Sequence, residues 1–225
     1  MNAPIRKQST LSLKARFQFR MGTTSYIVPD NILPNLRYLA DRVDDVELVL
    51  FESEELSNMP SPLEVEEMAA LACDHSLTYT VHLPLDTRLG SADESERRVS
   101  VRKCLHTIER MMPLDPWAYI LHLHGDRRGD PPTDDPDRWM ARNRESVQDL
   151  LRNSVPPHKI CVENLEYDFD RVADIVNAYD LSVCTDVGHL ILTHRDLEAH
   201  LDKWFDRTRV FHLHGVRGGT QDHVS

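Results

Sequence analysis

The 225-residue sequence lacks several features from which a function is commonly inferred. It has only four cysteines, Cys73, Cys104, Cys161 and Cys184, and no two of them form a Cys-x-x-Cys pair. Each lies in an apolar stretch, so we predict buried free thiols in a reducing cytoplasm and neither disulfides nor a cysteine-rich zinc site. No run of 18 apolar residues occurs, and the basic stretch MNAPIRKQSTLSLKARF lacks an apolar core. We therefore expect no transmembrane helix, no secretory signal and a cytoplasmic protein.

Glycine-rich phosphate-binding motifs are also missing. Neither GxGxxG nor GxxxxGKS follows the first apolar stretch, so the usual nucleotide sites of open α/β sheets are absent. The net charge of −11 provides no broad basic surface, which argues against a duplex nucleic-acid binder. We expect neither a nucleic-acid nor a membrane partner, and the oligomeric state stays open.

What is present is a regular alternation of short β-rich stretches with longer amphipathic ones. Start signals at Asp30, Ser61-Pro62 and Asp168 favour helices after them. Several strands are apolar on both faces, as in a parallel sheet covered by helices. Strands are predicted at 17–23, 46–51, 78–82, 118–122, 159–163, 181–185 and 209–212, and helices at 32–42, 62–75, 94–112, 137–153, 169–178 and 196–205.

Repeated βα units predict an open doubly wound sheet or a closed barrel. We favour a (β/α)8 barrel of the TIM type over residues 17–225, preceded by a basic tail at 1–16. Only seven strands are predicted where such a barrel has eight. We therefore expect the eighth βα unit to be missing, and we favour a C-terminally truncated chain over an incomplete barrel, whose first and last strands would have unpaired edges.

Ligand-type residues follow five successive predicted strands. The tetrapeptide HLHG occurs twice, giving the pairs His122/His124 and His212/His214. In a parallel barrel the carboxyl ends of all strands meet at one mouth, so these groups converge there. The others are His82, Glu163, Asp186, His189, Asp222 and His223.

Imidazoles combined with a few carboxylates favour zinc, manganese or iron over magnesium. Eight such groups exceed the needs of one tetrahedral ion, so we predict two or three divalent ions, most simply zinc, with Glu163 or Asp186 bridging. We assign catalytic roles to Glu163, His82, His122 and Asp186. The second histidine of each HLHG lies further into its loop and is expected to contact substrate or to support a ligand.

Residues outside this set receive more modest predictions. The loop at 125–137 contains Arg127 and Arg128, which we expect to contact a substrate phosphate. The remaining histidines lie in helices or loops and are predicted to be surface groups: His75, His106, His158, His194 and His200.

The order of these ligand-type residues resembles that of the xylose-isomerase-like barrel superfamily, which includes sugar-phosphate isomerases and epimerases and zinc-dependent apurinic endonucleases. The resemblance implies a metal centre at the barrel mouth. It departs from the endonuclease pattern because Asp222 and His223 are adjacent and because no strand-8 glutamate is present. The implied metal ligands are His82, His122, Glu163, Asp186, His189, His212, Asp222 and His223.

Several short segments further resemble the cobamide-remodelling phosphodiesterases of the CbiR type. These are FRMGTTSYIVPDNILPNL, VDDVELVLFE, VHLPLD and HLHGVRGGTQDH. The resemblance implies a corrinoid substrate and hydrolysis of the phosphodiester in the nucleotide loop of a cobamide. The products would be cobinamide phosphate and an α-riboside.

Three other functions stay open on the sequence. A divalent-metal sugar-phosphate isomerase or epimerase would use one metal with one or two carboxylate bases. An apurinic-endonuclease-like phosphodiesterase is less favoured by the acidic charge. A barrel that binds metal without turnover is the non-enzymatic alternative.

Overall fold

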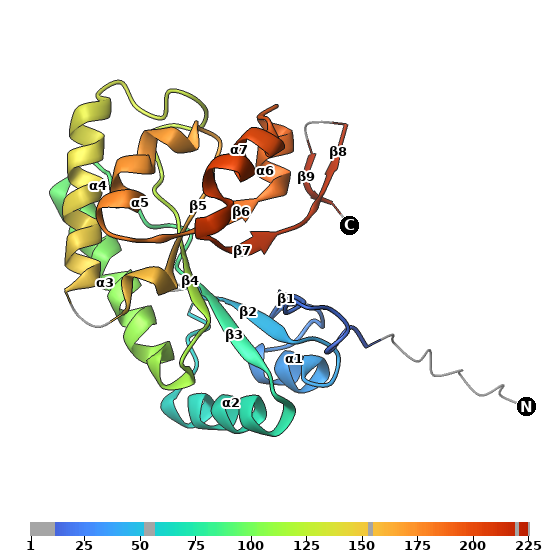
Figure 1. Cartoon of the computed structure of the whole chain (residues 1–225). Helices are drawn as coiled ribbons and strands as arrows, with labels where there is room; N and C mark the ends of the chain where they lie inside the picture. Colours follow the sequence, from blue (N-terminus) through green and yellow to red (C-terminus); the bar gives the residue numbers. More distant parts are fainter. Residues whose placement is uncertain (1–11, 52–56, 153–154, 219–220, 225) are drawn as a thin grey trace, which may run out of the picture.

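Seven parallel strands form the centre of the molecule. The computed structural model describes residues 12–51, 57–152, 155–218 and 221–224, without the side chains of the last four. The strands pair in chain order, each with its sequence neighbour, and helices lie around the outside of the curved sheet (Figure 1). They are β1 (Gly22–Thr24), β2 (Asp45–Val49), β3 (Thr78–His82), β4 (Ala118–Leu121), β5 (Ile160–Glu163), β6 (Ser182–Asp186) and β7 (Thr208–His212).

The helices follow the predicted βα alternation, with differences in extent. The stretch predicted at 169–178 begins as the 3₁₀ helix η3 (Phe169–Val172) before becoming α-helical, and a short helix after β6 was not predicted. The α-helices are α1 (Ile32–Leu39), α2 (Pro62–His75), α3 (Glu94–Met111), α4 (Pro136–Leu151), α5 (Ala173–Ala178), α6 (Val187–Leu192) and α7 (Leu197–Trp204). Three more 3₁₀ helices are η1 (Met112–Leu114), η2 (Pro157–Lys159) and η4 (Phe205–Arg207).

Two of the three helix start signals are confirmed. Ser61 forms a capping box with Glu64, and Asp168 accepts a hydrogen bond from the Asp170 amide. The assignment of Asp30 is wrong, because Asn31 occupies the cap of α1; the Asp30 carboxylate instead accepts from the Asn31 amide.

The first predicted strand, 17–23, is mostly wrong. Residues 17–21 are irregular, and β1 begins only at Gly22. The Asp44 carboxylate accepts the backbone amides of Ala15 and Met21. A side chain therefore satisfies the Met21 amide directly before β1, and that amide is not available to a neighbouring strand.

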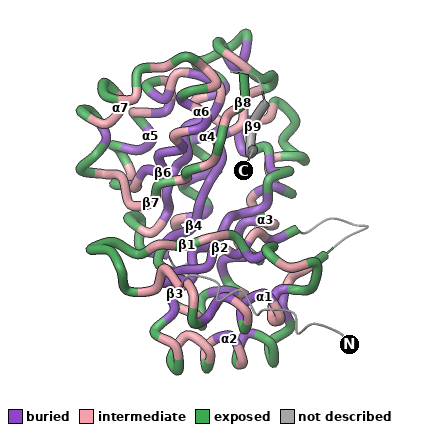
Figure 2. Tube along the Cα trace, turned by 90° about the vertical axis from the view of Figure 1, so that its right-hand side faces the viewer, coloured by how far each residue is buried: buried purple, intermediate pink, exposed green. Residues whose placement is uncertain are grey.

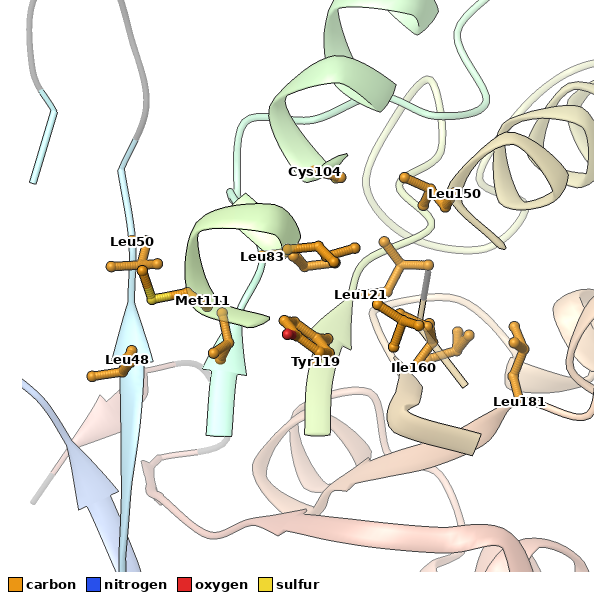
Figure 3. Packing of buried hydrophobic residues seen from close by; sticks show 14 of the residues in the cluster. Leu48, Leu50, Leu83, Cys104, Met111, Tyr119, Leu121, Leu150, Ile160 and Leu181 are labelled. Atoms are coloured by element: carbon orange, nitrogen blue, oxygen red, sulfur yellow. The ribbon is translucent and has the colours of Figure 1, made fainter. Parts of the chain in front are cut away.

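Side chains along each strand alternate between two environments, as the period of two requires. One set faces the helices and forms the main hydrophobic core. Figure 3 shows part of this layer, in which Leu48, Tyr119 and Leu121 pack with Met111 of α3 and Leu150 of α4. This layer holds the helices on the outside of the sheet.

The other set faces the inside of the curve. At its floor Ala118, Ile120, Cys161 and Cys184 form a separate small apolar cluster. The strands that carry it are among the most deeply buried parts of the chain (Figure 2). Two residues further towards the carboxyl ends of these strands, the inward-facing side chains are titratable. The candidate site therefore lies directly above this apolar cluster.

The sheet curls enough for β7 to contact strands that are not its neighbours. Arg209 stacks on the Trp117 ring, 3.8 Å from its centroid, and its Nε donates to the Trp117 carbonyl at 2.9 Å. At the other end of β7, His212 contacts Glu47 of β2.

The predicted barrel-type fold is confirmed, and the described residues contain no eighth parallel strand. Two further strands, β8 (Gly215–Arg217) and β9 (Gln221–Val224), pair antiparallel with each other.

Part of the predicted N-terminal tail contacts the barrel. The Leu13 amide donates to the Arg42 carbonyl at 2.8 Å, and Lys14 donates to the Val43 carbonyl at 2.8 Å. The remainder of the tail, residues 1–11, lies outside the described residues.

The predictions for cysteine and histidine need two corrections. Cys104, Cys161 and Cys184 are buried free thiols, but Cys73 is exposed near the end of α2. His200 and His75 are only partly exposed: the His200 ring packs against Phe169 with the centroids 5.5 Å apart, and His75 pairs with Asp41 at 2.8 Å. Among the described residues, no helix is both long enough and apolar enough to cross a membrane.

A buried carboxyl on β2 makes the fold sensitive to pH. Burial raises the pKa of Asp45 from 3.8 to about 6, against hydrogen bonds from Thr78 and Thr80 that lower it. The folded state therefore retains a proton that the unfolded chain releases, and the associated stability is lost as the pH rises through about 6.

We expect Asp45→Asn to match the wild-type stability near pH 4 and to exceed it above pH 6, by on the order of 1–3 kcal/mol. Each kcal/mol corresponds to roughly 2–4 °C in the melting temperature. Thermal unfolding of both metal-free chains across this range measures the difference, and a difference that does not vary with pH would contradict the assignment.

Candidate metal centre

Inward-facing residues at the carboxyl ends of β3 to β7 converge on one buried cluster. His82 ends β3, His122 follows β4, Glu163 ends β5, Asp186 ends β6 and His212 ends β7. Glu163 is only 2% exposed and Asp186 only 1%. Charged groups this deeply buried require compensating partners, and here those partners are the surrounding imidazoles.

Glu163 lies at the centre of the cluster. Its Oε2 is 2.8 Å from His122 Nε2 and 3.6 Å from His82 Nε2. Its Oε1 is 3.4 Å from His212 Nδ1 and 3.6 Å from His189 Nδ1. One carboxylate therefore contacts four imidazoles from four different parts of the chain.

Asp186 organises the neighbouring part of the site. Its Oδ1 accepts the His189 amide at 2.7 Å, which caps α6 and explains why this helix begins immediately after β6. His214 Nε2 lies 3.0 and 3.2 Å from the two carboxylate oxygens. The Asn164 side chain brackets Asp186 by bonding both its amide and its carbonyl.

Three groups of side chains have ligand-type atoms within 4.8 Å of one another. The groups are His82, His122 and Glu163; Glu163, Cys184 and His212; and Asp186, His189 and His214. Imidazole, carboxylate and thiolate are the donors that zinc accepts, and each group supplies three of the four ligands of a tetrahedral site. The residues therefore fit divalent transition-metal ions, with Glu163 shared between two of the groups.

The electrostatics of the cluster separate charged from neutral groups. Burial alone would raise the pKa of Glu163, but His122, His212 and His82 hold it well below its ordinary value. Burial lowers the pKa of His122 more than Glu163 raises it. Glu163 and His122 are thus in the protonation state that metal ligands require. Glu163 raises the pKa of His82 against burial, and the pKa of His212 is raised well above its ordinary value, so metal binding would displace protons from these two rings.

A cavity of about 200 Å³ opens beside the cluster. His124 lines it and also touches the cluster, since its Nε2 lies 3.3 Å from His122 Nδ1. Burial, with a smaller effect of His122, lowers the pKa of His124 to about 4. The cavity lies between the loops that follow β3, β4 and β5, so a ligand in it would lie next to the candidate metal groups.

The two predicted phosphate contacts also line this cavity. Arg127 is paired with Asp134 at 2.7 Å, whereas the Arg128 side chain is 93% exposed and lies 3.6 Å from Glu166. A third arginine, Arg88, lines the same cavity and donates to the Gly125 carbonyl at 3.3 Å.

The structure thus brings together His82, His122, Glu163, Asp186, His189, His212 and His214, with His124 one contact away. Asp222 and His223 fall in β9, and their side chains lie outside the described residues.

Sequence reasoning missed Glu47, Cys184, Asn164 and Arg88. Glu47 had a detectable signal, because it is a lone carboxylate in the otherwise apolar stretch VELVLF. Cys184 could have been found by its spacing, since it lies two residues before Asp186 and so on the same strand face.

A glycine makes the contact between Asp186 and His214 possible. A Cβ at Gly188 would lie 1.9 Å from Cε1 of His214, so Gly188→Ala must displace that ring. Alanine is favoured over glycine in a helix, so α6 itself should tolerate the change. We expect the variant to fold normally but to bind metal more weakly at the Asp186 group, as measured by elemental analysis after dialysis.

A double-mutant cycle sharpens this expectation. His214→Ala should cause the same loss, and the double variant should be no worse than either single one, because both act through one ring. Additive losses would show that Gly188 acts elsewhere.

The fold and site define a parallel α/β barrel with a histidine–carboxylate cluster at its mouth. The sequence profile of the family "Xylose isomerase-like TIM barrel" matches residues 37–225. The chain belongs to this family. A search of curated proteins finds no match to the sequence.

Solved structures with the same fold include several enzymes. A D-tagatose 3-epimerase-like protein superposes with a TM-score of 0.72 at 17% identity, covering 91% of this chain and 79% of the other. Endonuclease IV from Thermus thermophilus gives 0.64 at 21% identity, covering 91% and 80%. TTHB071 from the same organism, solved after soaking with ZnCl2, gives 0.65 at 20% identity, covering 90% and 79%.

Proposed function

We propose that this chain is a metal-dependent phosphodiesterase that hydrolyses the nucleotide-loop phosphodiester of a cobamide. The observation that carries the proposal is the shared position of Glu163 between two groups of ligand-type side chains, with a third group around Asp186. An epimerase needs one ion and carboxylate bases, whereas this cluster has donors for at least two ions. The assignment of a corrinoid substrate rests on the resemblance of the segments around β1, β2, β3 and β7 to those of CbiR-type phosphodiesterases.

The metal is proposed to be zinc, with manganese or iron as alternatives, bound as two or three ions. His82, His122, Glu163, Asp186, His189, His212 and His214 would hold them, and Asp222 and His223 remain proposed ligands by resemblance. When bound, such ions supply positive charge that activates a water and stabilises the oxygens of a phosphoryl displacement.

The protein's own residues prepare the site for this chemistry. Glu163 retains its negative charge among the imidazoles, so it would compensate the positive charge of ions held at this buried site. Asp186 positions His214, and the Asn164 carbonyl, 2.9 Å from Nδ1, positions His189. The arginines at the cavity, Arg88, Arg127 and Arg128, are proposed to bind the substrate phosphate.

The proposed reaction breaks the bond between phosphorus and the ribose oxygen. The oxygen of water bonds to phosphorus, and its proton passes to the departing ribose oxygen. The products are therefore cobinamide phosphate and an α-riboside. The site has no serine or cysteine placed as a nucleophile in the groups described, and Cys184 is buried with a pKa raised well above its ordinary value by burial.

A second candidate, a single-metal sugar-phosphate epimerase, is favoured by the structural likeness to a D-tagatose 3-epimerase-like protein. Metal stoichiometry separates the two. We expect at least two ions per chain by elemental analysis of protein purified without chelator, whereas one ion per chain would favour the epimerase.

The decisive experiment compares substrates. The purified chain is incubated with an intact cobamide, with abasic duplex DNA and with simple sugar phosphates, and the products are separated by chromatography. We expect cobinamide phosphate and an α-riboside from the first and no change in the others. Cleavage of abasic DNA, isomerisation of a sugar phosphate, or metal binding without any turnover would each overturn the proposal.

A further inference from the structure

The inward face of β2 contributes a residue that lies in the middle of its strand and not at the end. Glu47 extends from β2 across the mouth, and its Oε2 lies 2.7 Å from His212 Nε2. Both side chains are largely buried, at 14% and 19% exposed. We infer that Glu47 is a positioning residue that fixes the His212 ring so that Nδ1 faces the metal centre.

The two nitrogens of His212 have different surroundings. Nε2 meets Glu47, while Nδ1 lies 3.4 Å from Glu163 Oε1 and 3.7 Å from Asp186 Oδ2. A neutral imidazole has one N–H and one lone pair. In a neutral ring that binds an ion, the carboxylate at Nε2 would hold the one remaining proton there and leave the Nδ1 lone pair on the side of Glu163 and Asp186. Metal-binding histidines commonly donate their second N–H to a carboxylate in this way.

The topology explains why the partner comes from a distant strand. In the described residues β7 is the last strand of its sheet, so it has a neighbour only on the β6 side. The outward side chains at its end are poorly covered, since Phe211 is 43% exposed and Leu213, directly after the strand, is 72% exposed. Within the part of the chain that the structure describes, no neighbouring strand on the side of β7 away from β6 restrains the His212 ring. The contact with Glu47, which crosses from β2, provides that restraint.

A purely structural role, in which the pair only ties β7 to β2, makes a different prediction. Such a tie would affect folding of the metal-free chain and leave the metal affinity of the folded chain unchanged. The inference rests on the metal centre of the proposed function, and the test therefore uses Zn²⁺ alone as its probe.

The test measures Zn²⁺ affinity by competition with a chromophoric chelator. Glu47→Ala should bind Zn²⁺ about 10- to 100-fold more weakly than the wild type, the range found when such supporting carboxylates are removed. Glu47→Gln should lose less, several-fold, because its amide oxygen still accepts the Nε2 proton. The matched control is Asp45→Asn, the next inward carboxyl on the same strand, which should bind Zn²⁺ as the wild type does.

A second readout uses the Zn²⁺-loaded chains. Nitrogen-15 NMR of the histidine rings at saturating Zn²⁺ should show His212 with its proton on Nε2 in the wild type and in Glu47→Gln, and no longer held in that form in Glu47→Ala. Wild-type affinity in Glu47→Ala, even with a lower melting temperature, would overturn the inference. If Glu47→Ala does not fold, wild-type affinity in Glu47→Gln overturns it instead.

Failure of the proposed function would be visible separately. A wild-type chain that binds Zn²⁺ but leaves the cobamide intact removes the phosphodiesterase proposal. Weaker Zn²⁺ binding in Glu47→Ala would still support the positioning role in that case.

Discussion

Glu163→Gln is expected to lower the rate of cobamide hydrolysis by at least about 100-fold, the scale of losing a catalytic metal or its electrostatic effect. Glutamine preserves the size of the side chain but removes the charge that two groups of ligands share. Its amide would also place an N–H donor against His122 or His212, where the carboxylate now only accepts. We expect the loss of at least one ion per chain, measured by elemental analysis alongside initial rates.

The control for this variant is His158→Ala. His158 is exposed in η2, which precedes β5 and lies at the opposite end of the strand from Glu163. Its backbone carbonyl accepts a hydrogen bond from Ser182 Oγ at 2.7 Å, and alanine retains that group. The control should turn over and bind metal normally; near-normal turnover in Glu163→Gln would show that Glu163 is structural.

Asp186→Asn should produce a loss of similar size through a different group. Asparagine can still accept the His189 amide, so the start of α6 should survive. The charge that His214 faces at 3.0 Å is removed, and with it the carboxylate of the third ligand group. We expect at least about 100-fold slower hydrolysis and a lower metal content, with the fold intact by circular dichroism.

Asp196→Asn is the matched control, because Asp196 caps α7 through the Ala199 amide in the same manner but lies outside the cluster. It should leave rate and metal content unchanged. If both aspartate variants lose activity equally, the effect belongs to helix capping and the metal role of Asp186 is contradicted.

Together these variants test whether the cluster works as one centre. Glu163 links the His82–His122 side to His212, and His212 in turn lies between Glu163 and Asp186. When side chains act as one unit, the effects of substituting them on the rate are not additive. A Glu163→Gln/Asp186→Asn double variant should therefore be little slower than the slower of the two single variants. Multiplied losses would instead indicate independent sites.

The convergence of these side chains at one end of the barrel was predictable from sequence because the information is local. A parallel barrel places every strand's carboxyl end at one mouth, and alternation along a strand decides which residues face inward. His82, His122, Glu163, Asp186 and His212 all satisfy both conditions. Helix starts such as Ser61 and Asp168 were predictable for the same reason, since a cap depends on residues within one turn.

Contacts between distant segments were not predictable in this way. The late start of β1 at Gly22 is one example, because the Asp44 carboxylate, distant in sequence, binds the Met21 amide directly before it. Glu47 joins the site only because the sheet curls until β2 faces β7, and no local pattern specifies how tightly a sheet curls.

The two HLHG segments mark the boundary between what sequence and tertiary structure decide. The sequence by itself determined that both follow strands, and that His122 and His212 point into one mouth. Only the tertiary structure decided that His124 faces a cavity while His214 faces Asp186, and that His122 contacts Glu163 while His212 lies between Glu163 and Glu47. Identical residues differ here because their partners come from other strands and loops, brought close by the packing of the whole chain.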